Sequence, residues 1–290
     1  MSVPAAAEKI ATLGTVPITN ALLTGWVVVA VFVVFAAALA RKRREIPRGI
    51  QNAFEAFVEV LLGFMDQVTH DRRRSLKFLP IVGTLFPLIL VSNWMGLIPG
   101  FGTFGFGCGG HECIPLFRAA TSDLNFTLAM GITSVVLSHI FGMIALGFFA
   151  HWNKFIQIGH VVKAFGQVRK MGVGEGAMHL FTVFIEVGVG LIELVSEVAK
   201  MISLSLRLFG NIFAGEVLLS VLSSLFAFLM PTPFMFMELL VGVIQALVFS
   251  ILTLVYLTMA TERPHGSGEE HADSEPRTAV GAQQPALGAG

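Results

Sequence analysis

Residues 202–219, ISLSLRLFGNIFAGEVLL, place one arginine, Arg207, inside an otherwise apolar run. An amide, Asn211, and a carboxylate, Glu216, follow it in the same run. An ionised side chain near the middle of a bilayer costs at least about 2.5–3.5 kcal/mol, so such residues are rare and typically functional. We therefore take Arg207 as the residue whose position needs an explanation.

The chain around this stretch has the composition of an integral membrane protein. Of its 290 residues, 54% are apolar and only 13% are charged, whereas soluble domains carry about 25% charged residues. The formal net charge is zero. Net charge therefore gives no argument for nucleic acid or for an acidic substrate, and the distribution of charge matters more than its sum.

Five segments are predicted to cross the membrane: residues 21–40, 76–98, 124–149, part of 178–229, and 234–260. Residues 178–229 form a single helical pattern that would be about 78 Å long, more than twice the thickness of the ~30 Å hydrocarbon core. Such a helix either tilts steeply or lies with its first half along the inner interface. The pattern leaves both arrangements open.

Residues 48–70 are predicted to form an amphipathic helix on the inner membrane surface. Basic clusters flank it on both sides, RKRR at 41–44 and RRR at 72–74, so a crossing would put one cluster on the wrong side. With five crossings, the inner segments hold 15 of the 19 Lys and Arg residues, which predicts an external N-terminus and a cytoplasmic C-terminus.

The predicted fold class is an all-α integral membrane protein with five crossing helices and one interfacial helix. Residues 1–262 are expected to form a single membrane domain. Residues 263–290 are polar, acidic and rich in Gly and Pro, and we expect a disordered cytoplasmic tail.

The long helix carries a polar stripe. At 100° per residue, five side chains fall within about 40° of the Arg207 direction: Glu193, Ser196, Lys200, Ser203 and Asn211. Glu216 lies on the opposite side, about 13 Å further along. The pattern is therefore compatible with two polar paths that lie on opposite faces of the helix and at different depths in the membrane.

A simpler interpretation is that only residues 208–229 cross the membrane. Lys200 and Arg207 would then be flanking cations whose side chains extend to the inner surface. This interpretation leaves Glu216, Glu238 and Gln245 deep in the membrane without an explanation, and for them function is the default hypothesis.

Four stretches together resemble one known family. SLSLRLFGNIFAGE at 203–216 and LLVGVIQALVFSILTLVYLTMA at 239–260 are similar to subunit a of F-type ATP synthases, the stationary partner of the rotating c-ring. SNWMGLIPGF at 92–101 and TSDLNFTLAM at 121–130 are also similar to that family. The likeness covers roughly residues 16–262 in the family's order.

The resemblance implies a proton-translocating stator subunit in a bacterial inner membrane, with a long tilted helix hairpin facing the c-ring and with peripheral-stalk b subunits as further partners. Arg207 matches the family's essential arginine. The other matched positions are those of the outer half-channel (Asn211, Glu216 and Gln245), those of the inner route (Glu193, Ser196, Lys200 and Ser203) and a polar position at the outer end of its helix (Asp123). Glu238 stands where other members carry different polar residues, often His.

The chain itself is not expected to be catalytic. None of its seven lysines is followed by Ser or Thr, so it has no P-loop and is expected to bind neither ATP nor another cofactor. An independent ion channel or secondary transporter remains the alternative, and a purely structural membrane scaffold is a third possibility.

Cys108 and Cys113 lie in a predicted external loop, CGGHEC at 108–113. A disulfide and two free thiols are both compatible with an oxidising compartment. His111 and Glu112 form too short a cluster to predict a metal site. His139, within the fourth crossing, is interpreted as a buried, hydrogen-bonded histidine.

Overall fold

The computed structural model describes residues 7–13, 16–41, 48–98, 105–106, 114–149, 151–152, 173–225 and 230–262, and these are predominantly helical. Two short antiparallel hairpins interrupt the helices: β1 (Lys9–Leu13) with β2 (Val16–Thr19), and β3 (Gly105–Phe106) with β4 (Ile114–Pro115). The predicted all-α membrane fold is confirmed. The hairpins, which the sequence pattern did not predict, are short additions to it.

Five helices of the described chain are long and apolar enough to cross a membrane. They are α1 (Asn20–Arg41), α3 (Arg72–Met95), α4 (Leu124–Leu146), α7 (Val173–Leu225) and α8 (Pro231–Thr261). The sixth helix, α2 (Ile50–Thr69), is amphipathic: it buries Leu61, Leu62 and Met65 and exposes its carboxylates at Glu55 and Glu59.

Helix α8 lies at the centre of the bundle and packs against α2, α3, α4 and α7. Its side chains Phe249, Leu254 and Leu257 are completely buried. On the neighbouring helices Ile89 and Leu208 are also fully buried and belong to the same apolar core. Burial of this apolar surface between the helices fixes where the polar side chains of α7 and α8 meet.

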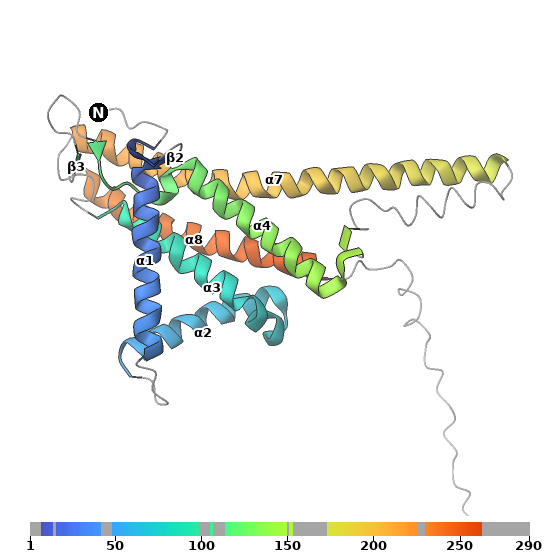
Figure 1. Ribbon diagram of the computed structural model, residues 1–290, viewed down its shortest axis with the longest axis horizontal. Helices are drawn as coiled ribbons and strands as arrows, with labels where there is room; N and C mark the ends of the chain where they lie inside the picture. Colours follow the sequence, from blue (N-terminus) through green and yellow to red (C-terminus); the bar gives the residue numbers. More distant parts are fainter. Residues whose placement is uncertain are drawn as a thin grey trace, which may run out of the picture.

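Helix α7 is one continuous helix of 53 residues, about 80 Å long at 1.5 Å per residue. Its first part extends well past the rest of the bundle, and α1 crosses α7 and α8 instead of running beside them (Figure 1). Helices α1 and α7 therefore cannot both run along the membrane normal. If α1 does, then the α7–α8 hairpin must be steeply tilted in the bilayer.

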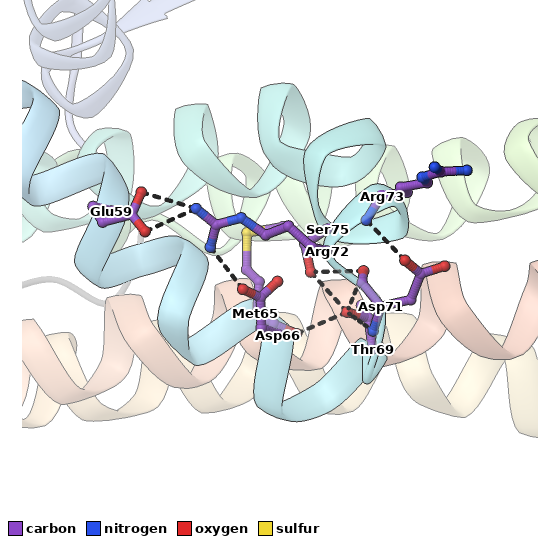
Figure 2. Close-up of polar contacts among 8 residues, drawn as sticks. All are labelled: Glu59, Met65, Asp66, Thr69, Asp71, Arg72, Arg73 and Ser75. Atoms are coloured by element: carbon purple, nitrogen blue, oxygen red, sulfur yellow. Dashed lines mark hydrogen bonds and ion pairs between the residues drawn. The ribbon is translucent and has the colours of Figure 1, made fainter.

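The corner between α2 and α3 is fixed by capping and by ion pairs (Figure 2). Helix α2 ends at Thr69 and is followed by His70, which takes the left-handed backbone conformation with φ 52°, a common way to terminate a helix. The Asp71 side chain accepts a hydrogen bond from the backbone N–H of Arg73 at 2.8 Å and so caps α3. Arg72 reaches back to α2, where it pairs with Glu59 at 2.8 Å and Asp66 at 2.6 Å.

This corner is also tied to the end of α8, because Arg74 lies 3.5 Å from the carboxylate of Glu262. The hydroxyl of Ser75 and the guanidinium of Arg72 lower the pKa of the Asp66 carboxyl. Both favour the ionised carboxylate, so the corner is held in part by charge.

A second polar node joins α3 to α8 and to the short helix η2 (Ala120–Ser122). The buried amide of Asn93 donates to the carbonyl of Gly242 at 3.1 Å and accepts from the hydroxyl of Thr121 at 2.7 Å. Polar groups buried between helices need such partners, and this node sets the level of α8 relative to α3.

Candidate functional site

Helix α7 has a buried face and an exposed face that differ in chemistry. Leu204, Leu208 and Ile212 are buried and pack into the apolar core. Arg207 lies on the other face and is exposed, and among the described residues it makes no hydrogen bond or ion pair. An unneutralised cation on the outer face of a membrane helix calls for water or for a partner outside this chain.

The predicted polar stripe is only partly buried. Ser196, Ser203 and Asn211 are exposed like Arg207, whereas Glu193 and Lys200 are half-buried. The stripe therefore faces outward near Arg207 and turns towards the bundle at its lower-numbered end.

Asn211 contacts α8 through Gln245, donating to its side-chain carbonyl at 2.8 Å. Residue counting with helices ending at 229 and starting at 234 places Gln245 about ten residues out of level with Arg207. In the structure α8 begins at Pro231. The hydrogen bond shows that Gln245 lies level with Asn211, one helical turn from Arg207.

A cavity of about 430 Å³ lies at one end of the bundle, between the last part of α7 and the first part of α8. Glu216 and Glu238 both line it, as does Asn93 of α3. The structure thus brings together two predicted site carboxylates from different helices. The volume is sufficient for several water molecules.

Arg118, which precedes α4, lines this cavity and forms an ion pair with Glu216. Its Nε donates to the two carboxylate oxygens of Glu216 at 2.9 and 3.1 Å. The Arg118 side chain is only 5% exposed, and its guanidinium lies 5.8 Å from the ring centre of Phe213. Arg118 was not predicted as a site residue; its isolation in an otherwise uncharged segment just before a helix was the signal available.

Glu238 lies against the backbone of α7. A Cβ placed on Gly215 would overlap the Glu238 carboxylate. Glu238 is 7% exposed, and within the described chain its Oε1 has no hydrogen-bond partner. A small residue at Gly215 therefore makes room for a carboxyl that reaches from α8 towards α7.

A second, smaller cavity of about 40 Å³ lies near the C-terminal end of α8. Glu193 and Lys200 line it together with Glu197, His139 and His151. The last three were not predicted as site residues. Glu197 lies about 80° around α7 from Arg207 and so falls outside the predicted stripe.

The two cavities are offset along the hairpin. Lys200 and Glu216 are separated by about 24 Å along α7, and Arg207 lies between them. The arrangement is that of two polar recesses, one towards each end of the bundle, with an exposed cation at an intermediate level.

Asp123 has a local structural contact that the sequence analysis did not assign. It caps α4, accepting from the backbone N–H of Asn125 at 3.0 Å. Asp123 is buried, and it is not among the residues that line the larger cavity.

Cys108 and Cys113, the predicted disulfide candidates, lie outside the residues that the structure describes, as do His111 and Glu112. Within the described ranges, no group of three or more His, Cys, Asp and Glu side chains is arranged to hold a metal ion.

Comparisons with known proteins place the chain in a family. The family model for the ATP synthase A chain matches residues 22–258. ATP synthase subunit a of Moorella thermoacetica is 31% identical over 245 residues, which cover 84% of this chain and 92% of the relative. The same subunit of Aliarcobacter butzleri is 31% identical over 84% of this chain and 88% of the relative, and that of Campylobacter jejuni is 32% identical over 80% and 86%. With this coverage and its five membrane-crossing helices, the chain belongs to the ATP synthase subunit a family.

Proposed function

We propose that this chain forms two aqueous half-channels beside a rotating c-ring and that Arg207 separates them. The observation that carries the proposal is the exposed, unpaired position of Arg207 among the described residues of a membrane-crossing helix. A cation in that position is stabilised if an ionised carboxylate of another subunit comes to lie opposite it.

The chemistry of arginine suits this role. A carboxylate on a rotating ring can face lipid only when it is neutral, because an ionised group would be excluded from hydrocarbon. The guanidinium stays protonated at all physiological pH values and so favours the ionised ring carboxylate. The ring site must therefore release its ion at Arg207, and the same positive charge opposes a direct leak of cations between the half-channels.

The larger cavity is assigned to the outer half-channel. Glu216 and Glu238 line it and offer carboxylates that can hand protons to the ring, with Arg118 fixing the orientation of Glu216. Asn211 and Gln245, hydrogen-bonded to each other, form the polar contact between this cavity and Arg207. Asp123, which caps α4, is proposed as a polar position at the outer end of this route.

The smaller cavity is assigned to the inner route. Glu193 and Lys200 line it, and Ser196 and Ser203 continue the polar face from it to Arg207. Protons that enter from one side can then reach the other only by travelling with the ring. Each charge that moves down a membrane potential of 100 mV supplies about 2.3 kcal/mol to drive rotation.

The proposed setting is a bacterial inner membrane with the N-terminus outside and the C-terminus in the cytoplasm. The excess of Lys and Arg in the segments assigned to the inside supports this orientation. The proposed partners are the c-ring at the exposed face of α7, the peripheral-stalk b subunits and membrane lipid. ATP is made or hydrolysed elsewhere in the complex.

The experiment that tests the proposal is ATP-driven proton pumping in inverted membrane vesicles that contain the assembled complex. Arg207→Ala is expected to abolish pumping, and Arg207→Lys to retain little of it because lysine lacks the planar fork and the very high pKa. Ser224→Ala is the control, since the Ser224 hydroxyl contacts only its own helix at the carbonyl of Val221. Full pumping by Arg207→Ala would refute the proposal.

A second preparation separates the coupled subunit from an independent channel. The purified chain alone in liposomes is expected to conduct no protons under a membrane potential. Steady conductance by the isolated wild-type chain would instead support the independent channel.

A further inference from the structure

Four ionisable side chains form a continuous series beside the smaller cavity. Lys200 donates to Glu197 Oε1 at 2.6 Å, and Glu197 Oε2 lies 3.7 Å from Nε2 of His139. The other nitrogen of the same ring, Nδ1 of His139, lies 3.1 Å from Nε2 of His151. Both nitrogens of His139 are thus engaged, one by a carboxylate and one by a second imidazole.

The side chains of this series come from three parts of the chain, and the last of them, His151, is nearly inaccessible to solvent. The side chain of Glu197 on α7 is 15% exposed and that of His139 on α4 is 30% exposed. His151 is only 3% exposed. All three line the same cavity, whose volume admits a few water molecules.

The series is linked to Arg207 through Tyr256 of α8. Lys200 Nζ lies 5.4 Å from the centre of the Tyr256 ring, and the Tyr256 hydroxyl lies within electrostatic range of both Arg207 and Glu197. Tyr256 also lines the smaller cavity, together with the histidine pair. Glu193, from the same face of α7, lines this cavity as well.

We propose that His139 is a proton-exchanging residue that carries protons from Glu197 towards the aqueous surface at the C-terminal end of α8, with His151 holding the other nitrogen of its ring. The inference deepens the function proposed above and rests on it. Imidazole suits the task because its ordinary pKa, about 6.5, lies close to physiological pH.

The transfer is balanced at each step. A protonated Glu197 gives its proton to Nε2 of His139, which forms an imidazolium and leaves a carboxylate. The imidazolium then releases the proton on Nε2 to water in the cavity, which the 30% exposed His139 side chain can reach. Nε2 of His151 accepts the hydrogen bond from Nδ1 of His139 throughout, so the cycle ends with both rings in their first tautomers and with no net change in the protein.

The test uses membrane vesicles that hold the assembled complex, with rates normalised to the amount of this chain in the membrane. His139→Ala is expected to slow ATP-driven pumping about ten-fold, and millimolar imidazole is expected to restore much of the loss. Ser138→Ala is the matched control, because Ser138 lines the same cavity but bonds only to its own helix at Val135.

Two results would overturn the inference. One is an unchanged pumping rate in His139→Ala. The other is a slow variant that imidazole does not restore and that His139→Gln, which keeps a hydrogen-bonding side chain, restores fully; that outcome would make His139 a structural tie between α4 and α7.

Arg207→Ala, measured in parallel, distinguishes this failure from failure of the proposed function. If Arg207→Ala pumps normally, the proposed function is wrong. If it is inactive while either overturning result holds for His139, only the histidine relay is wrong.

Discussion

Arg118 and Glu216 are 98 positions apart in the sequence and form a bifurcated contact, from one N–H to both carboxylate oxygens, at the wall of the larger cavity. The Arg118 side chain is almost fully buried, so its loss would leave the Glu216 carboxylate facing the cavity without its cation. The Glu216 side chain is 31% exposed, so the loss is expected to lie between that of an exposed ion pair, about 0–1 kcal/mol, and that of a buried one, about 3–5 kcal/mol.

A double-mutant cycle measures this contact. Arg118→Gln and Glu216→Gln are each expected to lower the thermal midpoint of the purified chain in detergent. The double variant is expected to lose less than the two single losses combined, with a coupling of about 0.5–3 kcal/mol. Strictly additive losses would show that the two side chains do not interact.

The close approach of Gly215 to Glu238 leads to a second prediction. Gly215→Ala is expected to lower the thermal midpoint, because the new methyl group would overlap the Glu238 carboxylate and overpacking costs about 1–3 kcal/mol. Adding Glu238→Ala should restore the thermal midpoint, since it removes the carboxylate that the new methyl group would overlap. Gly188→Ala on the same helix is the control, because a Cβ there meets nothing within 4 Å. Equal effects of the two alanine substitutions would contradict the close contact.

The residues that sequence reasoning found and those it missed differ in how their contacts arise. Arg207, Asn211 and Glu216 stand out because they interrupt one apolar run, which a periodicity analysis detects. Arg118 and Glu197 gain their importance from partners on other segments, and no local pattern encodes such a contact. Only the packing of α4 and α8 against α7 reveals them.

At the scale of elements, the α2–α3 corner predicts a dependence of stability on pH. The pKa of Asp66 is lowered by Ser75 and Arg72, so the ionised carboxylate stabilises the fold above the ordinary value of about 3.9. This contribution is lost as the pH falls through the lowered pKa. The thermal midpoint of the wild-type chain should therefore fall more between pH 6 and pH 3 than that of Asp66→Asn.

Glu55→Gln is the control for this titration, because Glu55 lies on the same helix and accepts only from Gln51 at the surface. Its pH profile should follow the wild type. Parallel profiles for the wild type and Asp66→Asn would show that the corner does not depend on the charge of Asp66.

The helices themselves were largely predictable, and their ends less so. The five crossings follow from segment length and apolarity, which the structure matches. The last helix, α8, begins at Pro231 rather than at 234. Proline is favoured in the first turn of a helix, so the two prolines of MPTP at 230–233 fit within the start of α8.

At the scale of the whole molecule, the structure explains why the sequence left the position of the long helix open. Hydrophobic length alone does not distinguish a tilted helix from one that lies partly along the interface. The crossing of α1 over α7 and α8 (Figure 1) is set by contacts between distant segments, such as Asn20 with Pro115 at 3.3 Å. Periodicity carries no information about such contacts.

The central claim is that the exposed face of α7 around Arg207 contacts the rotor. Ser203 and Ser205 are two positions apart on this helix, yet Ser203 is exposed whereas Ser205 is fully buried against Gly131 of α4. Substituting each by cysteine, with the native cysteines replaced, places one thiol on each face.

The most direct measurement is oxidative cross-linking in native membranes between each of these cysteines and a cysteine placed beside the ion-carrying carboxylate of the c subunit. Ser203→Cys is expected to form the cross-link readily, and Ser205→Cys is expected to form little or none. A cross-link from position 205 with none from position 203 would contradict the account.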